Sequence, residues 1–254
     1  MEQSPYRELE FLVTMRYLHR FLPPDGIILD DGGGPGRYTL ELCREGREVV
    51  LCDIAPGNIK LAEEKIRREP EIVRTQLRDA VVGDIRNLPF PSNHFSAGLC
   101  LGGPLSHIPN PAERLQAVRE IVRVTQPGGV VFLTGIGYLA VLRTVMIECD
   151  HELINGSLDE FLIDGNANAF MNMRWHFFRA KELQELAESN RLTTITMVGC
   201  QGLSTGLEHD TDRLRLDEEK WQCWLKLLFD TASEPAIVDM AEHILYIGRK
   251  ECAS

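Results

Sequence analysis

The stretch that decides the fold reads Ile27-Ile-Leu-Asp-Asp-Gly-Gly-Gly-Pro-Gly-Arg-Tyr38. An apolar run ends in two carboxylates, a glycine-rich turn follows, and the residues after it have helical character. This order predicts a buried strand, a tight loop and the first turn of a helix. Only glycine readily adopts the positive φ and allows the close ligand approach that such a loop demands. Because helix N-termini carry unpaired N–H groups, and because ligands of open α/β sheets bind outside the carboxyl ends of the strands, the turn is a predicted ligand site.

The spacing of the glycines excludes two familiar phosphate-binding loops. A nicotinamide dinucleotide fingerprint requires G-x-G-x-x-G, but Arg37 stands at the third position after Gly34. The loop G-x-x-x-x-G-K-[ST] is absent from the sequence as well. The two aspartates beside the turn, Asp30 and Asp31, would repel a pyrophosphate and would suit a cation. The stretch therefore favours a positively charged ligand.

Five motifs in order resemble those of the class I S-adenosylmethionine-dependent methyltransferases. The first is Asp30-x-Gly32-x-Gly34-x-Gly36. The others are Asp53-Ile54 after the second apolar run, Gly83-Asp84-Ile85 after the third, Phe95 to Gly103 over the fourth, and Pro127-Gly-Gly before the fifth. The resemblance covers the first half of the chain well and the helix and strand at its end more loosely.

The resemblance implies an α/β fold with a Rossmann-like sheet of seven mostly parallel strands. The implied strand order is 3-2-1-4-5-7-6, with the last strand antiparallel and helices on both faces. The implied organisation is a single methyltransferase domain over residues 1–254, with an N-terminal helix in 1–24 and a cofactor-binding half in 25–136. Insertions at 137–178 and 202–235 are expected to form a lid that binds the acceptor.

The cofactor implied by the resemblance is S-adenosylmethionine, with S-adenosylhomocysteine as its product. Asp53 is expected to accept hydrogen bonds from the ribose hydroxyls, Asp84 to accept one from the adenine amine, and Asp30 to lie near the cationic end. The methionine carboxylate is expected on N–H groups of the glycine loop at the helix start. The expected cofactor-binding residues are Asp30, Gly32, Gly33, Gly34, Gly36, Tyr38, Asp53, Ile54, Gly83, Asp84, Ile85, Leu101 and Gly102.

Several of these residues also have simpler interpretations. The alternative role for Asp53 is to cap the N-terminus of the helix that follows it. The alternative role for Asp84 is that of an ordinary turn residue. Tyr6 and Arg16 of the N-terminal helix are candidate cofactor contacts, or residues that pack on the sheet. Asp31 departs from the family, which usually has an apolar residue there. Strand alternation points its side chain away from Asp30, and a buried carboxylate without a partner is costly.

Local patterns predict the remaining elements. Ser4-Pro5 is typical of a helix start and Asn110-Pro of another. Periodicity predicts further helices over 138–148 and 179–190, and a helix that carries Trp221, Trp224, Leu225 and Leu228 toward a core or a lid pocket. Strands are expected over 48–53, 80–82, 130–133, 192–198 and 243–248, and a loop over 202–215.

Methyl transfer from a sulfonium is an in-line displacement that needs no covalent nucleophile from the protein. Alignment of the reactants supplies much of the rate, and a base helps where the acceptor is a hydroxyl or a protonated amine. His107 and His176 are the candidate bases, with a structural or surface histidine as the alternative for each. The seven histidines form no H-E-x-x-H and no paired Cys/His set, so no metal site is predicted.

Composition limits the substrate class. Of the 254 residues, 44% are hydrophobic and 26% are charged, as in ordinary globular proteins. The net charge of −11 argues against a nucleic-acid partner, because phosphate backbones are bound through Lys and Arg. Seven scattered cysteines make no disulfide framework, and neither a signal peptide nor a membrane-spanning run is apparent. A cytoplasmic monomer or homodimer without a membrane partner is expected.

These features together predict a methyltransferase that acts on a small-molecule acceptor. Two alternatives remain at this stage. One is a methyltransferase of tRNA or protein, and the other is a non-catalytic nucleoside-binding module with the same fold.

Overall fold

The computed structural model describes residues 4–154, 156–167 and 174–252, which contain one seven-stranded sheet in the order β3-β2-β1-β4-β5-β7-β6. Strands β1 to β5 pair in parallel, and β7 runs antiparallel to both β5 and β6. The predicted fold class and strand order are therefore confirmed. The strands are β1 (Ile28–Asp31), β2 (Val49–Asp53), β3 (Leu77–Val82), β4 (Phe95–Cys100), β5 (Thr125–Ile136), β6 (Leu192–Gly199) and β7 (His243–Lys250).

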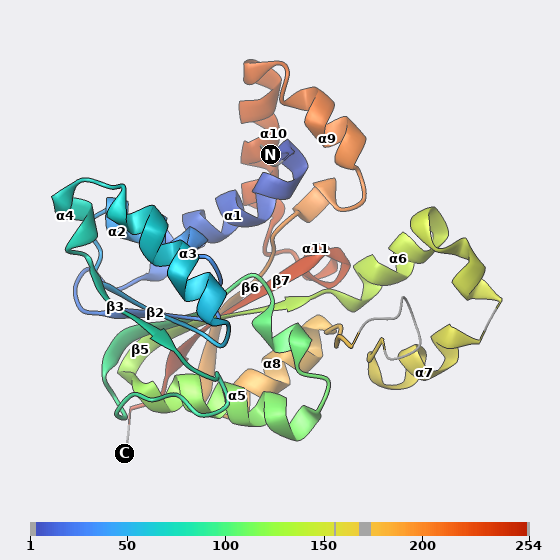
Figure 1. The fold of residues 1–254 in the computed structure, drawn as a ribbon. Helices are drawn as coiled ribbons and strands as arrows, with labels where there is room; N and C mark the ends of the chain where they lie inside the picture. Colours follow the sequence, from blue (N-terminus) through green and yellow to red (C-terminus); the bar gives the residue numbers. More distant parts are fainter. Residues whose placement is uncertain (1–3, 155, 168–173, 253–254) are drawn as a thin grey trace.

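Helices cover both faces of the sheet (Figure 1). On one face lie α1 (Pro5–Phe21), α2 (Arg37–Arg44) and α3 (Pro56–Arg67), and on the other lie α5 (Pro111–Val124) and α8 (Ala180–Glu188). The other helical segments are α4 (Glu71–Arg74), η1 (Pro104–His107), α6 (Tyr138–Glu148), η2 (Asp150–Leu153), α7 (Ser157–Asp164), η4 (Gly202–Ser204), α9 (Glu208–Leu214), α10 (Glu218–Thr231) and α11 (Pro235–Met240).

Strands β1, β2 and β4 are buried along their whole length, as a sheet covered on both faces requires. Successive side chains alternate between the two hydrophobic layers. Ile28 packs in the layer beneath α1 and α2, whereas Leu29 packs in the layer on the opposite face. Four of the seven cysteines are fully buried in this core, where cysteine behaves as a small hydrophobic residue.

Two predicted helix starts are confirmed by their capping contacts. The Ser4 hydroxyl accepts a hydrogen bond from the N–H of Arg7, and the Asn110 side chain accepts from the N–H groups of Ala112 and Glu113. In both helices proline occupies the first helical position, where its missing N–H costs nothing. None of the helices in the described ranges is long and apolar enough to cross a bilayer.

The predicted loop over 202–215 is wrong, because this segment contains η4 and α9. Its sequence is polar and lacks a helical pattern, but contacts with other parts of the chain stabilise a helix there. The Asp212 carboxylate accepts the N–H of Tyr6 at the start of α1, at 2.8 Å. The buried Thr211 hydroxyl donates to the Ser204 hydroxyl at 3.0 Å, which ties α9 to η4.

Strand β5 is longer than the predicted 130–133 and already begins at Thr125. The turn Pro127-Gly-Gly lies inside it, because the pairing with β4 jumps from Phe95–Thr125 to Ala97–Val130. A bulge therefore absorbs the extra residues. Strand β3 likewise begins at Leu77 rather than at the predicted residue 80.

The segment after β5 projects from one side of the sheet and forms a small core of its own (Figure 1). Tyr138 and Val145 of α6 pack there with Phe161 of α7 and Phe177. It coincides with the first expected lid insertion, of which residues 155 and 168–173 lie outside the described residues. Its role as a lid remains a prediction.

The second expected insertion packs against the N-terminal helix. Trp221, Leu225 and Leu228 of α10 form a buried cluster with Tyr6 and Leu9 of α1. Half-buried Trp224 packs against the same cluster. These side chains therefore face a core, as their helical spacing predicted.

We expect Gly137→Ala to destabilise the fold at the junction of β5 and α6. The φ of Gly137 is −76°, so the constraint is steric: a Cβ there would lie 1.9 Å from the carbonyl oxygen of Ala241. The free energy of unfolding, measured by urea denaturation, should fall by about 2 kcal/mol or more. Gly57→Ala in α3 is the matched control, because a Cβ there meets nothing within 4 Å. Equal stability of the two variants would contradict the expectation.

Candidate functional site

A cavity of about 610 Å³ opens at the carboxyl ends of β1 to β4, within the range of about 300–1,000 Å³ typical of ligand pockets. The sequence motifs after these four strands meet there. Its lining residues are Asp31, Gly32, Gly34, Asp53, Ile54, Ala55, Asn58, Gly83, Asp84, Ile85, Arg86, Leu101, Gly102, Pro104, His107, Ile108, Pro109 and Glu113. Of the predicted cofactor residues, Gly32, Gly34, Asp53, Ile54, Gly83, Asp84, Ile85, Leu101 and Gly102 are thus brought together.

The glycine turn is packed too closely for any larger side chain. A Cβ at Gly33 would lie 2.5 Å from Leu51 Cδ1 and 2.6 Å from Asp30 Oδ2. A Cβ at Gly32, whose φ is 67°, would lie 2.7 Å from Pro104 Cγ. Gly33 and Gly36 do not line the cavity, so their role here is to let the turn fold against β2 and α3.

The N–H groups of the turn are already hydrogen-bonded within the chain. Gly32 and Gly33 both donate to the carbonyl oxygen of Cys52, and Gly36 donates to the carbonyl oxygen of Gly33. Gly34 donates to Asp53 Oδ2 at 2.9 Å. The expectation that these donors hold a methionine carboxylate is therefore corrected.

Asp53 connects the glycine turn to the second strand. Besides the Gly34 contact, its carboxylate accepts the N–H of Ala55 at 2.8 Å and the side-chain amide of Asn58 at 3.0 Å. The N-cap of α3 is Ala55 and not Asp53, so the simple capping interpretation is wrong. The carboxylate borders the cavity and fixes the loop on one side of it.

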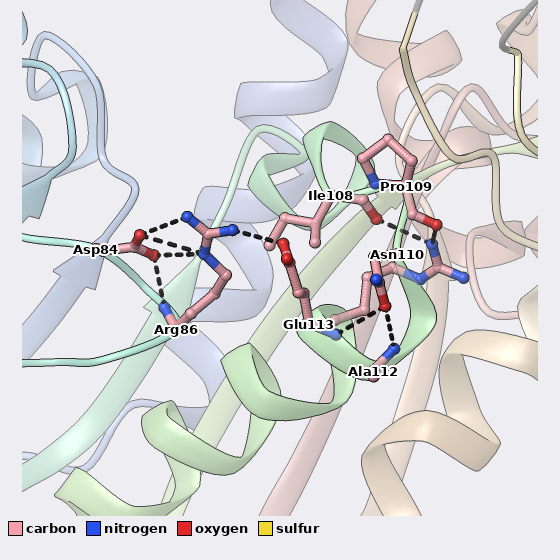
Figure 2. Close-up of polar contacts among 8 residues, drawn as sticks. Asp84, Arg86, Ile108, Pro109, Asn110, Ala112 and Glu113 are labelled. Carbon is pink, nitrogen blue, oxygen red and sulfur yellow. Dashed lines mark hydrogen bonds and ion pairs between the residues drawn. The ribbon is translucent and has the colours of Figure 1, made fainter.

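Asp84 at the end of β3 is held by a neighbour that the sequence analysis missed. Arg86 Nε lies 2.9 Å from Asp84 Oδ1, and Arg86 Nη2 lies 2.6 Å from Oδ2 (Figure 2). The guanidinium holds the pKa of the Asp84 carboxyl below its usual value. Asp84 also accepts the N–H of Arg86 at 2.9 Å, so it closes the turn as well. The pattern Asp84-x-Arg86 was the available signal.

Arg86 also reaches across the cavity to α5. Its Nη1 contacts the Glu113 carboxylate, which stands in the first turn of that helix (Figure 2). The Asn110 cap fixes this turn through the N–H groups of Ala112 and Glu113. The Asp84–Arg86–Glu113 chain therefore bridges the end of β3 and the start of α5 along one wall of the cavity.

The structure places Asp31, and not Asp30, against the cavity. The Asp30 carboxylate is fully buried beneath α2, where it accepts the N–H of Thr39 at 3.1 Å and its hydroxyl at 2.6 Å. Burial raises the pKa of Asp30 to about 6. Among the described residues, none makes a well-aligned hydrogen bond to a carboxylate oxygen of Asp31, which is 1% exposed, and the Gly32 N–H and the Cys52 thiol are its nearest donors. Burial, together with the Asp30 and Asp53 carboxylates, raises the pKa of Asp31 well above its usual value.

The two candidate bases are separated by the structure. His107 of η1 lines the cavity, its ring centroid lies 4.8 Å from that of Trp175, and burial lowers its pKa. His176 is buried away from the cavity. Its Nδ1 lies 2.9 Å from Asn166 Oδ1 and its Nε2 lies 2.7 Å from Glu182 Oε1, so the structural interpretation holds for it.

Three further sequence candidates also lie away from the cavity. Tyr38 is buried and donates to Glu10 Oε1 at 2.5 Å. Tyr6 donates to Glu242, and the Arg16 guanidinium lies 4.4 Å above the ring centroid of Phe229. For these three residues the packing interpretation describes the structure.

Comparison with known proteins supports the class that this geometry indicates. Residues 28–129 match the sequence model of the family described as "Methyltransferase domain". A demethylmenaquinone methyltransferase of Paenarthrobacter aurescens (strain TC1) is 35% identical over 102 residues, which cover 40% of this chain and 35% of that protein. The chain therefore matches about a third of the length of this relative.

Solved structures extend the likeness of the fold to nearly the whole chain. A SAM-dependent methyltransferase from Methanosarcina mazei has a TM-score of 0.62 at 21% identity, covering 93% of this chain and 98% of that one. The [4+2]-cyclase SpnF has a TM-score of 0.63 at 16% identity, covering 96% and 82%. At these identities the likeness shows the fold alone.

The strand order, the position of the cavity and the matched segment all point to the same class of protein. The strand order is that of the class I S-adenosylmethionine-dependent methyltransferases, and residues 28–129 match a methyltransferase domain. The resemblance stated from the five motifs is confirmed.

The carboxyl pair at the end of β1 predicts that stability falls as the pH rises. A raised folded-state pKa means that the native protein keeps protons that the unfolded chain releases above about pH 4. The free energy of unfolding should therefore decrease from about pH 4 through about pH 6, the pKa of Asp30, and further because of Asp31.

Asp31→Asn should remove one source of this loss. At about pH 7 the variant should be more stable than the wild type, and below about pH 4 the two should converge. Asp25→Asn, which changes an exposed aspartate before β1, is the control and should leave the profile unchanged. A variant less stable than the wild type at neutral pH would contradict the assignment.

Proposed function

We propose that this chain transfers a methyl group from S-adenosylmethionine to a small-molecule acceptor. The observation that carries the proposal is the single cavity in which the glycine turn, Asp53, Asp84 and the end of β4 meet. These residues follow four adjacent strands in the order that a nucleoside with an amino-acid tail would span. The matched methyltransferase domain at residues 28–129 supports the same cofactor.

The charge of the cavity supports a cationic cofactor. Asp31, Asp53, Asp84 and Glu113 line it, and Arg86 is the one guanidinium in the lining, already engaged by Asp84 and Glu113. Such a lining disfavours a pyrophosphate and suits a ligand with a positive charge near β1. When bound, the cofactor supplies an electrophilic methyl group on its sulfonium.

The residues of the chain then position the reactants. In this proposal Asp53 and Asp84 orient the nucleoside, and the Gly32–Gly34 turn admits its tail. His107 lines the cavity on the segment after β4, where it can accept a proton from an acceptor that loses one. Residues 137–178 and 202–235 are proposed to form the acceptor side.

A small acceptor is favoured over a macromolecule by the charge of the whole chain. The net charge of −11 opposes the phosphate backbone of a tRNA. The name of the demethylmenaquinone methyltransferase relative points to a small acceptor for that protein, but the match covers only 35% of its length. The name of this relative therefore does not identify the acceptor of this chain.

A second candidate function rests on the likeness to SpnF, a [4+2]-cyclase with the same fold. This fold also supports proteins whose names describe other chemistry. A nucleoside-binding protein without methyl transfer is therefore the alternative. The two are separated by incubating the chain with methyl-labelled S-adenosylmethionine and a broad panel of small acceptors, tRNA and protein. The proposal expects label in a small molecule, and cofactor binding without any transfer would favour the alternative.

Asp53→Asn should weaken binding of S-adenosylmethionine and S-adenosylhomocysteine alike. Both ligands share the ribose, and the lost carboxylate also releases the Gly34 N–H. A charge-assisted hydrogen bond contributes about 1.5–3 kcal/mol, so affinity measured by isothermal titration calorimetry should fall about tenfold or more for each ligand. Asp79→Asn, an exposed change on β3, is the control. Unchanged affinity in Asp53→Asn would contradict the ribose assignment.

His107→Gln should remove an acidic limb from the pH profile of methyl transfer. A base must be neutral, and burial lowers the pKa of His107 from its ordinary value of about 6.5. The wild-type rate should therefore rise with pH below about 6.5 and level off above it. His94→Gln, an exposed histidine before β4, should retain the limb. Retention of the limb in His107→Gln would eliminate this histidine as the base.

A further inference from the structure

Asp31 is a carboxyl of the cavity lining to which the proposed function assigns no individual contact. It is 1% exposed and occupies the last position of β1. Neither carboxylate oxygen has a well-aligned hydrogen bond among the residues described, and the groups nearest to donating one are the Gly32 N–H and the Cys52 thiol. Native proteins rarely bury an unpaired carboxylate, since its desolvation is costly. Such a group indicates a ligand that pairs with it.

Within the described part of the chain, no positive charge pairs with this carboxyl. The ionisable groups that face it are carboxyls and buried thiols from each neighbouring strand end, namely Asp30 on β1, Cys52 and Asp53 on β2, Asp84 after β3, and Cys100 on β4. Burial raises the pKa of both thiols, so they are neutral. The Arg86 guanidinium is bound to Asp84 and Glu113. Asp31 therefore keeps its own proton until a cation enters the cavity.

The order of the strands points to the part of the ligand that reaches Asp31. With the ribose on Asp53 of β2, the next strand is β1, and neighbouring strands lie about 4.8 Å apart. The sulfur of S-adenosylmethionine follows the ribose by a single methylene group. A step of one strand from Asp53 therefore places the sulfur beside Asp31.

We propose that Asp31 detects the charge on the sulfur of the cofactor, and this inference rests on the proposed function. The carboxyl is neutral beside the thioether of S-adenosylhomocysteine and ionised beside the sulfonium of S-adenosylmethionine. One proton leaves Asp31 for solvent when S-adenosylmethionine binds. After the methyl group has gone to the acceptor, the sulfur is uncharged, and Asp31 takes a proton back from solvent. The site thereby favours substrate over product.

The test is isothermal titration calorimetry of the full chain with each ligand near neutral pH, in phosphate and in Tris. These buffers have different ionisation enthalpies, so the difference in heat counts the protons exchanged. S-Adenosylmethionine should release about one proton and S-adenosylhomocysteine none. By linkage, the affinity for S-adenosylmethionine should then rise about tenfold per pH unit, while that for S-adenosylhomocysteine stays flat.

Asp31→Asn should abolish the proton release. Its affinity for S-adenosylmethionine near neutral pH should fall about tenfold or more, whereas its affinity for S-adenosylhomocysteine should change less than about twofold. Asp84→Asn is the matched control from the same cavity. It should affect both ligands alike and preserve the difference in proton release, because the Asp84 carboxylate is paired with Arg86 and not with the sulfur.

Equal proton release for the two ligands would overturn the inference, since it would place Asp31 at the α-ammonium group that both share. Proton release that persists in Asp31→Asn would overturn it as well. In either case both ligands bind, and the proposed cofactor stands. If neither ligand binds the wild-type protein, the proposed function fails and the inference fails with it.

Discussion

The architecture of the site depends on how closely the Gly32–Gly34 turn packs against β2. Two N–H groups of the turn share the carbonyl oxygen of Cys52, and the third donates to Asp53. There is no space for a Cβ at Gly33 between Leu51 and Asp30. Because the chain turns so tightly there, the space above the ends of β1 and β2 stays open. The tight packing of the turn against β2 thus keeps the space of the cavity free of the turn's own atoms.

Around this turn the sheet gathers side chains that are far apart in sequence. Asp53 is the last residue of β2, Leu101 follows β4 directly and Asp84 lies two residues after β3, so their positions follow from the topology. The ion pairs that Arg86 makes with Asp84 and Glu113 then join the β3 end to α5. The result is a cavity with carboxylates along its lining and its one guanidinium already paired, which suits a cation better than a phosphate.

Much of this arrangement was readable from the sequence. Apolar runs that end in Asp, Gly or both predict strand ends at one edge of a sheet, and the capping residues Ser4 and Asn110 marked two helix starts correctly. Nine of the thirteen predicted cofactor residues line the cavity, because each lies within three residues of a strand end. Periodicity and turn chemistry are local properties, so the sequence carries them directly.

The sequence-based predictions are wrong where a tertiary contact determines the position or the role of a residue. The sequence placed Asp30 at the ligand, but Thr39 of α2 binds its carboxylate, and alternation turns Asp31 to the cavity instead. The sequence made His176 a candidate base, but Asn166 and Glu182 occupy both of its ring nitrogens. The polar run over 202–215 was predicted as a loop, yet Asp212 ties it to α1 as a helix. None of these partners is near in sequence or marked by a motif.

The most direct measurement of the central claim is a crystal structure of the protein grown with S-adenosylhomocysteine. The adenosine should occupy the cavity above β2 and β3, with its ribose hydroxyls on Asp53 and its sulfur next to Asp31. A ligand bound elsewhere on the molecule, or density in this cavity that fits a pyrophosphate-linked nucleotide from the cell, would contradict the claim.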